Sequence, residues 1–65
     1  MSDEEHAEWI AQRKRLVIYL QATQQQIIDY PPRANDADYR FLLTKAAYYQ
    51  RMIDTIDNIL KSAFE

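Results

Sequence analysis

The side chains best suited to acid–base or metal chemistry lie near the start of the chain. The only histidine, His6, follows the acidic residues Asp3, Glu4 and Glu5. A carboxylate three residues before a histidine lies on the same face of a helix, which is the spacing that helical metal sites use. Those sites lie in the middle of a bundle with further ligands, whereas Asp3 and His6 lie at the end of an expected helix. We therefore predict no metal site.

A nucleophilic enzyme site is also not expected. The chain has no cysteine, and its serines are Ser2, an expected helix cap, and Ser62, near the end of the last expected helix. His6 therefore has no neighbouring nucleophile and third residue with which to build a catalytic triad. The absence of glycine argues against phosphate-binding loops and nucleophile elbows as well.

Asp54 and Asp57 form the one other pair that suggests acid–base catalysis. They are three residues apart and share a helix face, but such carboxylates are ordinarily solvated. Lys61, four residues after Asp57, is expected to pair with it. We predict that the protein is not an enzyme, that it has no catalytic residues, and that it needs no cofactor.

The one basic run, Arg13-Lys14-Arg15, raises the question of an anionic ligand. The chain carries 8 Lys and Arg against 10 Asp and Glu, and its pI is about 5.2. Nucleic-acid binding favours a basic face with a pI above about 9, so we do not expect it. An alternative is an anion or nucleotide pocket at a subunit interface, built from a partly buried Arg13 with Lys14 and Arg40.

Helix formers and prolines predict two helices of similar length. Residues 3–30 contain neither proline nor glycine, and Pro31-Pro32 ends the first helix because proline lacks the backbone N–H. Residues 31–35 then form a short loop before a second helix at 36–63. The predicted fold is all-α, a single antiparallel two-helix hairpin.

The apolar residues of the second helix form two stripes. The main seam alternates spacings of three and four: Tyr39, Leu42, Ala46, Tyr49, Ile53, Ile56, Leu60 and Ala63. The second stripe lies about 100° around the helix: Phe41, Tyr48, Met52, Thr55 and Ile59. One neighbouring helix cannot cover both, and Ile18 of the first helix also points away from its own seam. We therefore predict a homo-oligomeric helical bundle, a dimer of two hairpins being the simplest form.

The predicted function is non-enzymatic binding of a protein partner by this oligomer. Tyr and Arg beside a stiff Pro-Pro turn are typical of a recognition tip, although simple helix termination is the favoured explanation of the prolines. The residues predicted to bind a partner come from this tip and from the leftover apolar surface: Ile18, Tyr30, Arg33, Phe41, Tyr48, Met52 and Ile59.

We expect a soluble, cytoplasmic protein. The start of the chain is acidic rather than basic, unlike a secretory signal. The longest charge-free stretch, residues 16–28, has thirteen residues and is shorter than the ~20 needed to span a bilayer.

The second helix also resembles a known family. Asp38-Tyr39-Arg40-Phe41, followed by Gln50, is similar to the Asp-x-Arg-aromatic…Gln pattern in the hairpin domain of phage cyclic-oligonucleotide sponges. The resemblance implies a helical hairpin that oligomerises and sequesters cyclic nucleotides at subunit interfaces, in the host cytoplasm. Ser2-x-Glu4-Glu5 and then Arg13 resemble the family's first helix, where a Lys contacts the ligand. The family's glycine in the second helix has no counterpart here.

Overall fold

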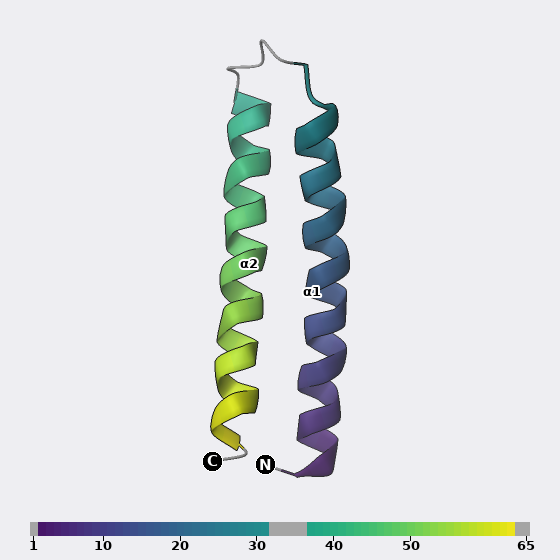
Figure 1. Ribbon diagram of the computed structural model, residues 1–65, viewed down its shortest axis with the longest axis vertical. Helices are drawn as coiled ribbons and strands as arrows, with labels where there is room; N and C mark the ends of the chain where they lie inside the picture. Colours follow the sequence, from purple (N-terminus) through teal and green to yellow (C-terminus); the bar gives the residue numbers. More distant parts are fainter. Residues whose placement is uncertain (1, 32–36, 64–65) are drawn as a thin grey trace.

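The computed structural model describes residues 2–31 and 37–63 and has two helices. Helix α1 spans Asp3–Asp29 and α2 spans Ala37–Ala63, 27 residues each. The helices lie side by side and run in opposite directions, so that the start of α1 is beside the end of α2 (Figure 1). The predicted all-α hairpin is confirmed. Of the predicted loop, only Pro31 is among the described residues.

The ends of α1 follow from local sequence. The Ser2 backbone is extended, and its hydroxyl accepts a hydrogen bond from the Glu5 backbone N–H at 3.2 Å, as an N-cap does. At the other end Tyr30 is extended, with φ −72° and ψ 142°, as the residue before Pro31 must be. The Tyr30 N–H donates to the Ile27 carbonyl at 3.3 Å, which closes the last turn.

Substituting Ser2→Ala is expected to lower the free energy of unfolding by about 1 kcal/mol, because an N-terminal backbone N–H loses its side-chain acceptor. Urea denaturation followed by circular dichroism measures the change. Ser62→Ala, in the exposed last turn of α2, is the matched control and should leave stability within a few tenths of a kcal/mol. Equal effects of the two substitutions would show that the Ser2 cap contributes nothing.

The core is small and lies in the middle of the hairpin. Among the described residues, four apolar side chains are buried: Leu16, Leu20, Ile53 and Ile56. Six more pack against them while partly exposed: Trp9, Val17, Ala46, Tyr49, Met52 and Leu60. The buried Thr23 satisfies its hydroxyl within α1 by donating to the Tyr19 carbonyl at 2.8 Å. The predicted seam of α2 is therefore confirmed from Ala46 to Leu60, whereas Ala63 is exposed.

Contacts between the helices define one register. Side-chain pairs that span the hairpin within the described residues include Arg13 with Asp57, Tyr19 with Tyr49, and Tyr30 with Tyr39. Each step forward along α1 is matched by a step of nearly the same length back along α2, as expected for straight antiparallel helices with the same rise per residue. A residue of α1 can therefore be assigned a neighbour at the same height on α2.

The hairpin is a thin rod that leaves much of its surface exposed. It measures 48 × 15 × 13 Å, and its radius of gyration is 15.0 Å, against about 11 Å for a compact domain of this length. It exposes 5278 Å², whereas a compact monomer of 7.8 kDa exposes about 4,400 Å². Two helices that touch along one line cannot enclose the apolar side chains on their other faces.

Candidate functional site

An exposed apolar surface runs along one side of the hairpin. It consists of Tyr19 from α1 with Phe41, Tyr48, Met52 and Ile59 from α2, and we call it the aromatic face. The four α2 residues are spaced by seven, four and seven positions, so they fall on one strip of the helix, about 100° from the buried seam. A strip at that angle faces sideways from the helix pair rather than into it.

Exposure varies along the aromatic face. Phe41, Tyr48 and Tyr19 are 64%, 57% and 50% exposed, respectively. Met52 and Ile59 are only half-buried, and Met52 packs against the core. The prediction that one neighbouring helix cannot cover both stripes is therefore wrong in part, because α1 partly covers Met52 and Ile59. Their strip borders the seam, so side chains of this length reach the edge of the helix interface.

Three tyrosine rings hold the middle of the aromatic face in place. The Tyr49 ring centroid lies 5.8 Å from that of Tyr19 and 6.0 Å from that of Tyr48. The Lys45 ammonium lies 5.9 Å from the Tyr49 ring centroid, within cation–π range. Rings held by one another lose little freedom on binding, which favours them as interface anchors. Sequence reasoning missed Tyr19 and Lys45. The register places Tyr19 level with Tyr49 and was the signal that would have identified it.

Ile18 lies apart from the aromatic face. It is 61% exposed and stands two residues from both Leu16 and Leu20, about 200° around α1 from these core positions. It therefore points away from α2. Leu43, also exposed, is two residues after Phe41 and lies on the opposite side of α2 from it. The predicted partner-binding residues thus do not form one continuous surface.

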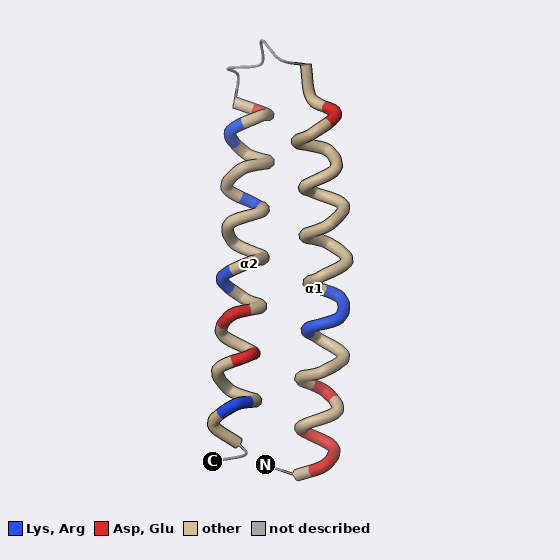
Figure 2. Tube along the Cα trace, viewed as in Figure 1, with Lys and Arg blue, Asp and Glu red and all other residues tan. Residues whose placement is uncertain are grey.

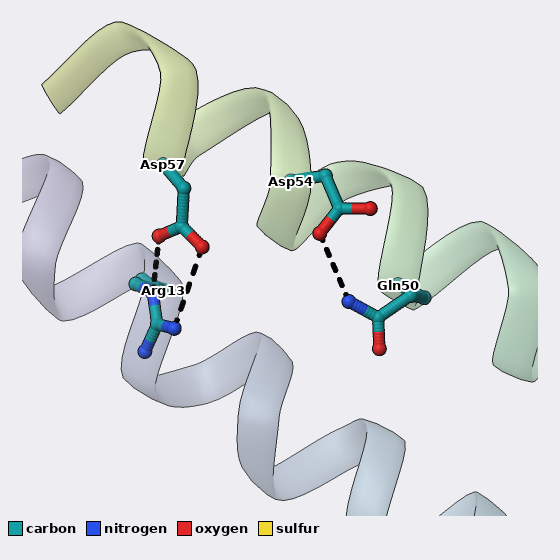
Figure 3. A network of polar contacts seen from close by, with 4 residues as sticks. All are labelled: Arg13, Gln50, Asp54 and Asp57. Atoms are coloured by element: carbon teal, nitrogen blue, oxygen red, sulfur yellow. Dashed lines mark hydrogen bonds and ion pairs between the residues drawn. The ribbon is translucent and has the colours of Figure 1, made fainter. Parts of the chain in front are cut away.

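Arg13 forms an ion pair with Asp57 across the hairpin. The Arg13 Nε donates to Asp57 Oδ1 at 2.6 Å and its Nη2 to Oδ2 at 3.5 Å (Figure 3). This hydrogen bond, and then the charge of Asp57, raise the pKa of the Arg13 guanidinium above its ordinary value. The expected pairing of Asp57 with Lys61 is therefore wrong, because the guanidinium on the facing helix takes the carboxylate. Asp54 next to it accepts from Gln50 within α2 at 3.0 Å.

The three residues of the predicted anion pocket do not lie together on the hairpin. Arg40 is level with about residue 29 of α1, which is 16 residues, or roughly 24 Å along the axis, from Arg13. Lys14 is exposed and about 100° around α1 from Arg13. Lys and Arg are accordingly spread along the rod rather than gathered in one patch (Figure 2). One hairpin does not bring Arg13, Lys14 and Arg40 together.

A hollow of about 440 Å³ lies at the end of the hairpin where α1 stops and α2 begins. Its lining includes Asp29, Tyr30, Pro31, Asp38, Phe41 and Leu42. The Tyr30 ring packs on that of Tyr39 with centroids 5.4 Å apart. Two of the predicted partner-binding residues, Tyr30 and Phe41, therefore border one cavity, while Arg33 lies outside the described residues. Sequence reasoning did not identify Asp29 or Asp38 as part of a site.

Comparisons with family models, with curated proteins and with solved structures give no significant match.

Over residues 2–31 and 37–63, neither helix combines the length and the hydropathy that crossing a bilayer requires. In the same residues, no three His, Asp or Glu side chains gather where they would hold a metal ion. The aromatic face and the hollow at the loop end are therefore the candidate functional surfaces.

Proposed function

We propose that this chain is a non-enzymatic binding protein that pairs with a second copy of itself through the aromatic face and presents its loop end to a protein partner. One observation carries the proposal: Tyr19 and Tyr48 are at least half exposed although their rings are fixed by Tyr49. Ordered, exposed aromatic side chains in a continuous patch are typical of an interface.

The exposed area supports a second copy as the occupant. The rod exposes 5278 Å², about 900 Å² more than a compact monomer of its mass. A stable interface takes about 800 Å² from each partner. Two hairpins laid face to face form a four-helix bundle, in which each helix has neighbours on two sides and both stripes of α2 are covered. A two-fold dimer is the smallest closed assembly of this kind.

The cyclic-nucleotide function implied by the family resemblance remains the alternative. It requires Arg13, Lys14 and Arg40 from different copies to converge, and it requires Arg13 to exchange Asp57 for a phosphate. Ligand binding to the folded state raises the melting temperature by mass action. A rise with micromolar cyclic dinucleotide would favour this alternative over the protein-binding role.

Concentration dependence of the melting temperature tests the self-association. We expect the melting temperature to rise by several degrees as the protein concentration increases about a hundredfold, because assembly stabilises the folded state by mass action. Thermal scans by circular dichroism at several path lengths measure it. A melting temperature that stays constant over the whole range would contradict the proposal.

A further inference from the structure

We propose that the hollow at the loop end is a receptor site for an arginine side chain of the protein partner. Its volume of about 440 Å³ lies in the range of about 300–1,000 Å³ typical of small-ligand sites. Its walls are mainly apolar, contributed by Tyr30, Pro31, Phe41 and Leu42, while Asp29 and Asp38 add two carboxylates to the lining. This proposal specifies the chemistry of the protein partner in the proposed function. It rests on the binding of a partner at the loop end and not on the self-association.

The charge of the hollow is not balanced within the described residues. Asp29 Oδ1 accepts a hydrogen bond from Gln25 Nε2 at 3.0 Å, and this neutral amide supplies no counter-charge. Asp38 has no ion pair with any residue in 2–31 or 37–63. Among the described residues that line the hollow there is no Lys or Arg. Two carboxylates that have no counter-charge among the described residues, set beside apolar walls, attract a cation and disfavour an anion.

The apolar walls select among cations. Phe41 is the aromatic-face residue nearest the loop end and also lines the hollow, and at 64% exposure in one hairpin the side of its ring that borders the hollow is open to a ligand. A guanidinium stacks on such a ring and donates several hydrogen bonds from one plane, whereas an ammonium is a compact and strongly hydrated charge. The methylene stem of an arginine packs on surfaces such as Leu42 and Pro31 while its head reaches the carboxylates. Aromatic, apolar and acidic groups in one cavity therefore favour arginine over lysine or a metal ion.

The probe for this site is the peptide acetyl-Leu-Arg-Leu-amide, titrated into the full chain and followed by amide chemical shifts. We expect saturable shifts at the end of α1 and the start of α2, with a Kd in the millimolar range as befits one anchoring side chain. Replacing the arginine of the probe by citrulline, which is nearly isosteric but neutral, should weaken binding about tenfold because the charge-assisted hydrogen bonds are lost.

Variants locate the binding to the hollow. Asp29→Asn together with Asp38→Asn should weaken probe binding by at least tenfold, while Asp54→Asn, exposed and remote along the rod, should leave it unchanged. Circular dichroism checks that each variant is as helical as the wild type. Equal binding of the arginine and citrulline probes, no effect of the double substitution, or shifts outside the loop end would each overturn the site.

Sedimentation of the same samples separates this site from self-association. Association without probe binding would overturn the arginine site alone. Probe binding by a monomer would overturn the self-association and leave the site standing.

Discussion

Replacing both Tyr19 and Tyr48 with glutamate is expected to turn the protein into a largely unfolded monomer. Both side chains are at least half exposed in one hairpin, so apart from their ring contacts with Tyr49 the substitutions remove little of its own packing. In the assembled form they place carboxylates in an apolar interface, where an unpaired charge costs several kcal/mol. That is a large share of the roughly 3–10 kcal/mol expected for a domain of this length. Sedimentation velocity and circular dichroism at one concentration measure both effects.

Ile18→Glu and Leu43→Glu are the matched controls. Each also replaces an exposed apolar side chain with glutamate, but at a position outside the aromatic face. We expect both to associate and fold like the wild type, within about 0.5 kcal/mol. If Ile18→Glu dissociated the protein as strongly as the double substitution, the interface would lie on the outer side of α1 instead. Met52→Glu is less informative, because Met52 also packs against the core of its own hairpin.

Ile56→Asp is expected to abolish folding altogether. Ile56 is the most buried core side chain at 1% exposure, and within the described residues no buried side-chain nitrogen or oxygen lacks a hydrogen-bond partner. Deleting a buried isoleucine costs about 2–5 kcal/mol, and a buried unpaired carboxylate adds several more. The sum meets or exceeds the roughly 3–10 kcal/mol available. Circular dichroism should show loss of most helical signal at room temperature.

Asn58→Asp, two residues later on the exposed side of α2, is the control for the charge itself. This variant should fold like the wild type because the side chain at position 58 is exposed to solvent, whether it is asparagine or aspartate. A helical Ile56→Asp variant with an unchanged melting temperature would show that the core does not lie where the buried residues Leu16, Leu20, Ile53 and Ile56 place it.

The helices and their seam could be predicted because the deciding interactions are local. Proline at position 31 ends α1 because it cannot continue a helix, and the Ser2 hydroxyl caps α1 by accepting a hydrogen bond from a backbone N–H only three residues later. The seam of α2 repeats with spacings of three and four, which only a helix brings to one face. These features depend on neighbours along the chain, so one sequence was sufficient to predict the hairpin.

The site was less predictable because it depends on the register between the helices. The segment around Ile18 and Tyr19 is apolar on all sides, so periodicity alone did not tell which of them joins the α2 stripe. Asp57 had a possible partner in its own helix, and only the register brings Arg13 within 2.6 Å of it. The hollow combines side chains from the end of α1 and the start of α2, so no stretch of one helix contains its signal.

Sedimentation equilibrium of the wild-type protein between about 1 and 100 µM tests the central claim most directly, because it gives the mass of the folded species without any substitution. Stable complexes bury about 800 Å² or more of surface on each chain. We predict a mass of twice 7.8 kDa at tens of micromolar, with helical circular dichroism in the same samples. A helical species at 7.8 kDa throughout this range would contradict the account, because the aromatic face would then remain exposed in the folded protein.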